Sequence, residues 1–411
     1  MSNIIKKLLS LILIIVFCTF SLSGCYNSNN IDNLAYVVAI GFDIGEINNL
    51  KISFQIALTS DNDSSSDSSQ SSNTVIHTIE CATIDSGINL LNSYITKKVD
   101  LSNCKAVVFS EELAINGLSK YVYTLINKVQ IRPDCNVVIS KNNVEYFLEN
   151  SKPTLENFSA RYYETISNSS AYTGYTDNVN IDAFYLSIKD TLINPTAIIS
   201  AVNESSLKNI NPNLDNIDKD SSYVAGETPV SNTDDLENMG LAVFFADTLV
   251  GELNGIETIC HLIVTNRLKT CNITIPNPLT ENENIDLSLN LKHNTKNKVN
   301  LVNGSPYINT NISIEAKILS INNDSEYLNK TNLEKIEESV NKYLEIKISD
   351  YLYKTSKEFG SDIVGFGKFA VSKFLYWDDW VDYNWLNNYK NSFFTVNVNT
   401  NIKSTYMLMS S

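Results

Sequence analysis

Residues 34–40 read LAYVVAI, an unbroken apolar run, and residues 52–58 read ISFQIAL, with apolar side chains at every second position. Both patterns are typical of β-strands. The residues around 45–49 contain Gly45 and two asparagines, so they predict a turn between the strands. The fold therefore begins with two neighbouring strands.

The segments that follow alternate between helical and extended patterns. Residues 60–73 are almost entirely Ser, Asp and Asn and predict a polar surface loop. The remaining apolar patterns predict helices near 84–99, 118–129 and 144–148 and strands at 106–109 and 137–139. This order predicts a mixed sheet with helices packed on it, ending near Pro153.

Two further units complete the predicted organisation. A middle unit, residues 153–280, contains a helix near 184–188, a strand at 197–202, a polar excursion at 203–238 and a hairpin at 241–253. A third unit, residues 281–411, has two alternating strands, a long helix and a final strand at 394–402, and predicts an antiparallel sheet with helices. The fold class predicted for the chain is α+β, with three small mixed-sheet domains in tandem: residues 25–152, 153–280 and 281–411.

The first 24 residues have the pattern of a secretory signal with a lipidation site. Lys6 and Lys7 precede an apolar run at 8–20, and the run ends in Leu22-Ser23-Gly24-Cys25. Small residues suit a signal peptidase, and the thiol of Cys25 can carry a diacylglyceryl group. The alternative is an uncleaved membrane anchor, but the run is short for a bilayer-spanning helix. We expect a body tethered to a membrane through lipid on Cys25.

Composition limits the classes of partner. The chain has 411 residues, 43% of them hydrophobic, and a formal net charge of −15. Such a body can form sizeable cores, and its charge argues against nucleic acid as a ligand. Five cysteines follow Cys25, an odd number without CxxC spacing, and predict buried hydrophobic residues with at most one adventitious pair rather than a disulfide framework: Cys81, Cys104, Cys135, Cys260 and Cys271.

No catalytic or metal-binding constellation is evident in the sequence. The three histidines are far apart, and GxSxG, Walker and GxGxxG motifs are absent. Residues 365–368 read GFGK but lack the remaining glycines of a phosphate loop, so a tight turn or helix contact is the better interpretation. Residues 377–380 read WDDW, which suits a sugar or ammonium pocket or, more commonly, a packing edge with solvated charges.

Several short blocks together resemble the Ger(x)C family of spore germination lipoproteins, the C subunits of nutrient germinant receptors. The blocks are the lipobox, ending at Cys25, and the sequences at 31–35, 40–43, 240–244, 249–253, 257–258 and 361–367, with Trp377, Trp380 and the final strand. They occur in family order along the mature chain. One departure is Tyr26-Asn27, where the family usually has Trp-Asp directly after the cysteine.

The resemblance implies a non-enzymatic, three-domain α+β lipoprotein on the outer face of the spore inner membrane. It implies two integral membrane subunits as partners, no nucleic acid, and no cofactor apart from the lipid on Cys25. It also assigns structural roles to Gly41, Asp43, Gly251, Glu257, Asp362, Gly365 and Gly367, with the last two glycines allowing a helix to approach its neighbour. A substrate-binding lipoprotein and a cell-wall hydrolase using Asp378 and Asp379 are the alternatives.

Overall fold

The computed structural model describes residues 2–21, 31–47, 49–58, 74–151, 159–203, 222–229, 236–281, 283–320 and 330–403. The strands are β1 (Leu34–Asp43), β2 (Leu50–Ala57), β3 (Thr74–Cys81), β4 (Lys98–Asp100), β5 (Ala106–Ser110), β6 (Asn136–Ser140), β7 (Thr196–Val202), β8 (Leu236–Phe245), β9 (Thr248–Leu253), β10 (Cys271–Pro276), β11 (Asn284–Val302), β12 (Ser305–Ser320) and β13 (Phe393–Ile402). The α-helices are α1 (Ser2–Ser21), α2 (Ile84–Tyr94), α3 (Glu111–Ile115), α4 (Ser119–Ile126), α5 (Val144–Asn150), α6 (Ser159–Thr165), α7 (Ile181–Lys189), α8 (Gly255–Val264), α9 (Lys330–Tyr353), α10 (Gly367–Ala370), α11 (Trp377–Tyr383) and α12 (Trp385–Asn388). Both Cys25 and the polar loop predicted at 60–73 lie outside the described residues.

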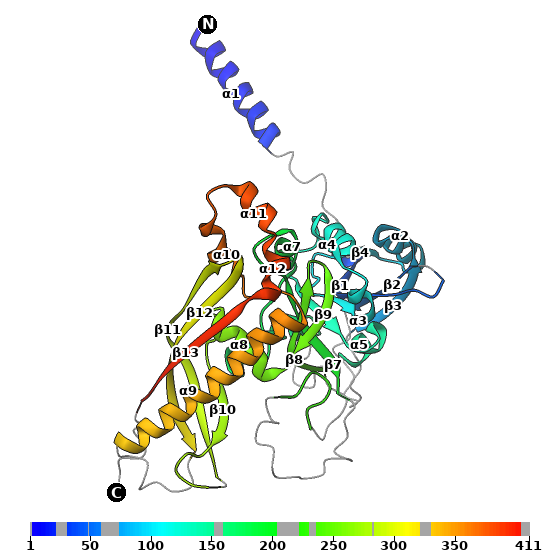
Figure 1. Cartoon of the computed structure of the whole chain (residues 1–411). Helices are drawn as coiled ribbons and strands as arrows, with labels where there is room; N and C mark the ends of the chain where they lie inside the picture. Colours follow the sequence, from blue (N-terminus) through cyan, green and yellow to red (C-terminus); the bar gives the residue numbers. More distant parts are fainter. Residues whose placement is uncertain are drawn as a thin grey trace, which may run out of the picture.

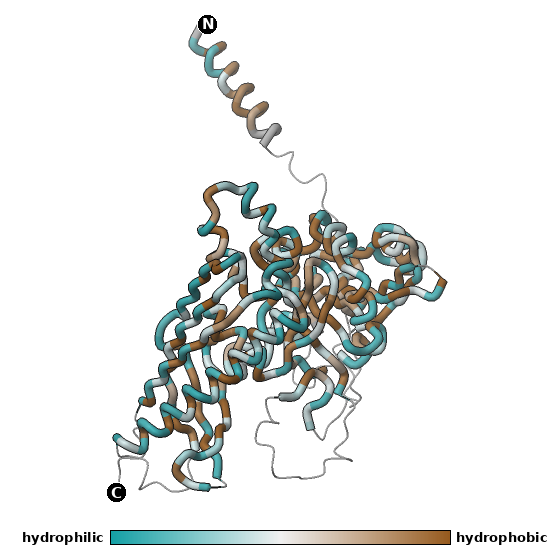
Figure 2. Tube along the Cα trace, in the orientation of Figure 1, coloured by the Kyte–Doolittle hydropathy of each residue, from teal (hydrophilic) through white to brown (hydrophobic). Residues whose placement is uncertain are grey.

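The larger sheet has nine strands and is built around β1 (Figure 1). Its order is β3-β2-β1-β5-β6-β7-β8-β9, and β4 pairs with the start of β1. The strands β1, β5, β6 and β7 are mutually parallel, whereas β2, β3, β8 and β9 are antiparallel to their neighbours. The unbroken apolar run at 34–40 is explained because helices cover both faces of the parallel strands. Hydrophobic stretches, brown in Figure 2, run through this sheet.

Two hydrophobic clusters lie on opposite faces of the large sheet. Ile40 belongs to one cluster, together with Val122 of α4 and Phe184 of α7. Ala39 belongs to the other, together with Phe147 of α5 and a residue of α6. The sheet is therefore the middle layer of a helix–sheet–helix arrangement, whereas the sequence predicted only a mixed sheet with helices packed on it.

The α+β class is confirmed, but the described strands form two sheets rather than one for each predicted unit. The strands β7, β8 and β9 of the expected middle unit extend the first sheet, since β7 pairs with the open edge of β6, with Val138 opposite Ile198. Hydrophobic periodicity identifies a strand but does not say which free edge it will join. The domain boundaries at 152/153 and 280/281 stay predictions.

The smaller sheet has the order β10-β11-β12-β13, with α9 packed against it. The long helix predicted in the third unit is confirmed as α9, and its apolar residues Ile336, Val340, Leu344 and Ile348 are buried. The expectation of an antiparallel sheet is wrong for its last strand, since β13 runs parallel to β12. A parallel pair needs a long crossover connection, and α9 to α12 lie between these two strands.

The helix α8 and the polar excursion complete the body. The buried side chains of α8 pack in one hydrophobic cluster with β8, β9 and the smaller sheet. The predicted excursion at 203–238 is shorter than expected, since β8 already starts at Leu236. There Asn203 Nδ2 donates to Thr228 O and to Glu237 Oε2, each at 2.8 Å. None of the helices within the described ranges has the length and apolar character needed to cross a membrane.

Candidate functional site

The first two predicted motif residues, Gly41 and Asp43, hold α5 against β1. Asp43 is buried, and its Oδ2 accepts the N–H of Val144, the first residue of α5, at 2.9 Å. A carboxylate at this position satisfies one of the N–H groups that a helix leaves free at its start. A Cβ on Gly41 would lie 2.1 Å from Val144 Cγ1, so only glycine lets the helix lie this close.

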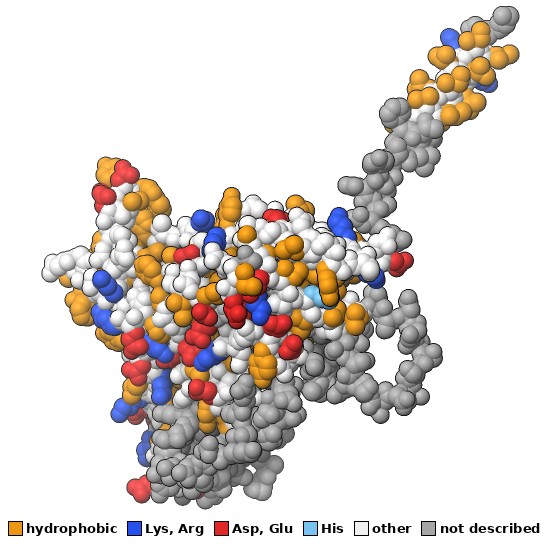
Figure 3. Space-filling view, turned by 90° about the vertical axis from the view of Figure 1, so that its right-hand side faces the viewer, with side chains coloured by type: hydrophobic (Ala, Val, Ile, Leu, Met, Phe, Trp, Pro, Cys, Tyr) orange, Lys and Arg blue, Asp and Glu red, His pale blue; other side chains and the backbone are white. Residues whose placement is uncertain are grey.

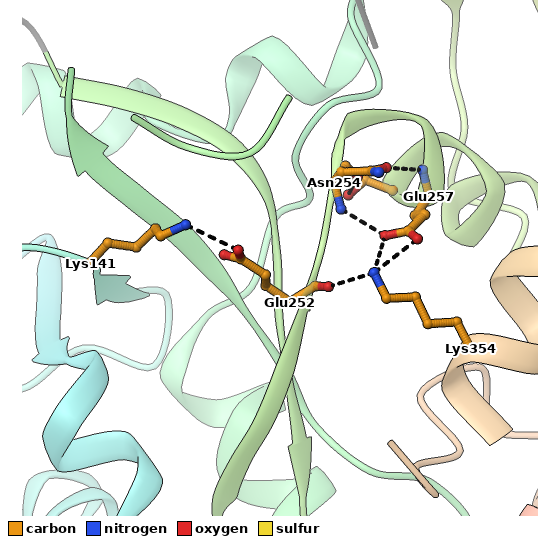
Figure 4. Close-up of polar contacts among 6 residues, drawn as sticks. Lys141, Glu252, Asn254, Glu257 and Lys354 are labelled. Carbon is orange, nitrogen blue, oxygen red and sulfur yellow. Dashed lines mark hydrogen bonds and ion pairs between the residues drawn. The ribbon is translucent and has the colours of Figure 1, made fainter. Parts of the chain in front are cut away.

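Glu257 has a double role at the start of α8 (Figure 4). Its N–H donates to Asn254 Oδ1 at 3.0 Å, and its Oε2 accepts the N–H of Asn254 at 2.9 Å, which together form a capping box. The same carboxylate lies 2.8 and 2.9 Å from Lys354 Nζ. Glu257 therefore fixes the beginning of its own helix and binds a lysine from the smaller sheet's side of the molecule.

Lys354 connects the two sheets. It is the first residue of a single π-helical turn, Lys354–Glu358, that continues α9, and its Nζ also donates to Glu252 O at 3.1 Å. The side chain of Glu252 forms an ion pair of 3.0 Å with Lys141, which follows β6 (Figure 4). All four charged side chains are partly shielded from solvent. We call Lys141, Glu252, Glu257 and Lys354 the sheet junction.

Gly251 makes room beside the sheet junction. A Cβ on this residue would lie 2.3 Å from Cε1 of Phe359, which follows the π-helical turn. The Phe359 ring is thus seated directly on the backbone of β9, and Lys354 Nζ lies 5.4 Å from its centre. The motif at 249–253 therefore positions the end of α9.

Asp362 organises the segment that follows α9. It is fully buried, and its Oδ1 accepts the N–H groups of Gly365 (2.8 Å) and Phe366 (3.1 Å). Its Oδ2 accepts the N–H of Gly367 (2.9 Å) and the indole N–H of Trp385 (2.8 Å). Burial raises the pKa of Asp362 to about 6, although these four hydrogen bonds act in the opposite direction. We call this arrangement the Asp362 clamp.

The two glycines of the clamp serve different needs. Gly365 has φ +81°, a left-handed conformation that other residues rarely adopt. A Cβ on Gly367 would lie 2.5 Å from Leu192 O and 2.9 Å from Cδ1 of Trp385, so the close approach is to the loop after α7 and also to the start of α12. The phosphate-loop interpretation of 365–368 is unsupported here, because the carboxylate of Asp362 already occupies the N–H groups of 365–367.

A network of buried polar side chains around His261 has no motif in the sequence that predicts it. His261 Nδ1 lies 2.7 Å from Tyr351 O–H, and Arg267 donates to His261 Nε2 and forms an ion pair with Asp177. Burial, and then the positive charge of Arg267, hold the pKa of His261 well below its usual range, so its ring is neutral. His261 and Arg267 lie on and just beyond α8, and no known motif links them to Tyr351.

The cysteines behave as predicted within the described residues. Five are free and buried: Cys81, Cys104, Cys135, Cys260 and Cys271. The Sγ of Cys135 donates a hydrogen bond to the Sγ of Cys104 at 3.9 Å, and the two form no disulfide. Burial raises the pKa of Cys81, Cys260 and Cys271, which lowers their reactivity.

The described ranges hold no cluster of metal ligands. No three His, Cys, Asp or Glu side chains there lie close enough to hold a metal ion. Asp378 and Asp379 are exposed in the first turn of α11, where Trp380 is buried but Trp377 is not, so 377–380 form no shared pocket. A cavity of about 450 Å³ lies beside the β8–β9 turn, and one of about 280 Å³ lies between α7 and the Asp362 clamp, with Arg267 and Lys368 in its lining.

Comparisons with known proteins agree with this architecture. Residues 27–202 match the family model "Spore germination protein N-terminal domain", and residues 239–406 match "Spore germination B3/GerAC like, C-terminal". The solved structure titled "Crystal Structure of the GerBC protein" is similar in fold, with a TM-score of 0.52 and 14% identity over 89% of this chain and 97% of that one. No curated protein matches the sequence. The two family models together cover most of the sequence, and the chain belongs to the Ger(x)C family of spore germination proteins.

Proposed function

We propose that this chain is the non-enzymatic lipoprotein subunit of a spore nutrient germinant receptor. The observation that carries the proposal is the match of both family models, in order, to residues 27–202 and 239–406. The family-motif residues lend support, because Gly41, Asp43, Gly251, Glu257 and Asp362 all serve packing or hydrogen bonding between elements. A body assembled in this way acts by holding its shape beside partners rather than by turning over a substrate.

The proposed attachment is a diacylglyceryl group on Cys25, at the outer face of the spore inner membrane. The lipobox at 22–25 supports it, and two acyl chains give stable attachment where one does not. The proposed partners are two integral membrane subunits that carry nutrient recognition and signal transmission. In this arrangement the chain is needed for the complex to respond to nutrients.

Germination assays test this function directly. Spores lacking the chain, or carrying Cys25→Ala, should lose the response to nutrients but still germinate with stimuli that trigger lysis directly. Cys271→Ala changes a buried thiol far in sequence from residues 1–24; it is the matched control, and these spores should respond normally. A normal nutrient response of the deletion strain, in a background without other germinant receptors, would overturn the proposal.

A substrate-binding lipoprotein is the second candidate, favoured by the cavity of about 280 Å³. Lys368 contributes positive charge to its lining, where Arg267 is already paired with Asp177, and Asn194 contributes a buried amide whose Nδ2 has no hydrogen-bond partner within the described residues. Its volume is near the lower end for small-molecule sites. Thermal shift of the purified protein with amino acids and sugars separates the candidates, because only a binding protein should show saturable stabilisation.

A further inference from the structure

Among the described residues after α1, three consecutive strongly exposed apolar side chains occur on one projecting segment. From α10 to the end of α11, Leu375 is 91% exposed, Tyr376 72% and Trp377 59%, and Phe369 and Val381 are also exposed. Figure 1 shows this segment standing above the body, and Figure 3 shows orange and red side chains at its end. We call residues 369–382 the apolar projection. A contiguous group of this kind marks a contact site on a soluble body.

The base of the apolar projection is firmly packed. Trp380 is buried, stacks on Trp385 with 6.0 Å between ring centres, and contacts the ring of Phe374 edge-on. Its indole N–H donates to Thr191 Oγ1 at 3.4 Å. Trp385 is in turn held by the Asp362 clamp. Residues 375–377 are therefore exposed on a well-packed base.

The apolar projection lies on the side of the body where β1 begins. Figure 1 shows α10 and α11 above the body, and Figure 3, turned about the vertical axis, shows the same projection at the top. The strand β1 starts on this side too, because Leu34 pairs with Lys98 of β4, which Figure 1 places there. The helices α4 and α7, which carry the exposed Tyr123 and Leu186, lie on the same side.

The length of chain after Cys25 limits how far the body can lie from the membrane. Residues 25 and 31 are six positions apart, and a fully extended chain spans at most about 3.5 Å per residue. A lipid on Cys25 therefore keeps the start of the described body within about 20 Å of the bilayer surface. A projection on that side of the body is within reach of the lipid headgroups.

We propose that the apolar projection inserts Leu375, Tyr376 and Trp377 into the interfacial layer of the bilayer, giving the body a second point of contact. The inference rests on the proposed lipid anchor. Trp and Tyr favour the level of the headgroups, where the ring is buried and its polar group stays hydrated. Three acids, Asp378, Asp379 and Asp382, outnumber the one lysine of residues 369–382, so apolar burial drives insertion and anionic lipid weakens it.

The native tryptophans provide the test. The lipidated chain from Cys25 onward is reconstituted, without partner subunits, into phosphatidylcholine vesicles with brominated acyl chains, which quench indoles within the bilayer. Trp380 and Trp385 are buried in the protein, so quenching must come from Trp377. We expect strong quenching that Trp377→Phe abolishes, that Leu375→Ser reduces, and that persists at high salt. Replacing part of the phosphatidylcholine by phosphatidylglycerol should weaken it.

Vesicle flotation of the same samples separates the anchor from the projection. Flotation without quenching would overturn the insertion of Trp377 and leave the anchor intact, and the exposed apolar surface would then be assigned to a protein partner. A Cys25→Ala chain that lacks residues 1–24 has neither the lipid nor the apolar leader, and its loss of flotation is expected from the anchor. Full flotation of that variant would refute the anchor itself. Leu186→Ser, at an exposed site on α7, is the matched control and should leave the quenching of Trp377 unchanged.

Discussion

Asp362→Asn is expected to destabilise the protein because each carboxylate oxygen accepts two N–H groups. In either orientation the NH₂ of asparagine would face two donors and leave both unpaired. Each unpaired buried donor costs about 1–3 kcal/mol, and removing a buried charge offsets part of that loss. We expect the free energy of unfolding to fall by about 2–4 kcal/mol at neutral pH.

The pH dependence gives a second, independent measurement. The pKa of Asp362 is about 6 in the folded protein, against about 3.9 in an unfolded chain. Folding therefore takes up a proton between these values, and the stability from this group is present below about pH 4 and lost as pH rises through 6. Linkage gives a loss of about 2 kcal/mol between pH 4.5 and pH 7.5, which Asn cannot show.

Urea unfolding followed by tryptophan emission measures both effects. Trp385 bonds directly to Asp362 and Trp380 stacks on Trp385, so the emission reports the unfolding of this region. The difference in free energy of unfolding between wild type and Asp362→Asn should be about 2 kcal/mol larger at pH 4.5 than at pH 7.5. Comparing the two proteins cancels the other carboxyl groups, which titrate in both.

Two results would refute the reasoning about Asp362. A loss below about 1 kcal/mol at neutral pH would mean that the four donors do not depend on the carboxylate. A difference that does not change with pH would mean that burial does not raise the pKa of this group. Asp379→Asn, at an exposed position of α11, is the control and should change stability by less than about 0.5 kcal/mol.

Two further changes test the other contacts. Lys354→Met should lower the free energy of unfolding by about 1–3 kcal/mol, because the Glu257 carboxylate and the Glu252 carbonyl lose the ammonium group that they share. The control Lys342→Met changes an exposed lysine on α9 and should have little effect in the same urea titration. Gly41→Ala should lower the free energy of unfolding by about 1–3 kcal/mol, because the new Cβ clashes with Val144 Cγ1. In a Val144→Ala background, which lacks that atom, the loss caused by Gly41→Ala should be smaller. A strictly additive double-mutant cycle would contradict the clash.

The strands and main helices could be predicted from the sequence because their periodicity reports burial. The run at 34–40 became β1, covered on both faces, and the face of α9 that includes Ile336 and Leu344 packs on the smaller sheet. The pairing of β7 with β6 and the direction of β13 could not be predicted. They depend on which edges are free and on where a crossover returns the chain, and neither leaves a local pattern.

The sequence indicates which motif residues have structural roles, but it does not indicate which groups they contact. The spacing of Asp362 and the glycines at 365 and 367 is compatible with a carboxylate accepting nearby backbone N–H groups, and this signal was present in the sequence. The fourth donor, Trp385, lies further along the chain and only the fold brings it to Oδ2. Only the fold brings Lys354 to Glu257, and only the fold joins Tyr351, His261, Arg267 and Asp177 in one buried polar network.

The Asp362 clamp also bears on how the body would sit at a membrane. Asn194 N–H donates to Asp362 O at 2.8 Å, and Ser361 Oγ donates to Phe244 O at 2.6 Å, so the clamp is attached to the large sheet. The apolar projection begins two residues after Gly367 and is held at its base by Trp385, so its direction relative to both sheets is set by the same contacts. A tether alone restrains distance and leaves rotation free. Two contacts with the bilayer, Cys25 and the projection, would also restrain the orientation, and a partner subunit would then meet a defined face of the body.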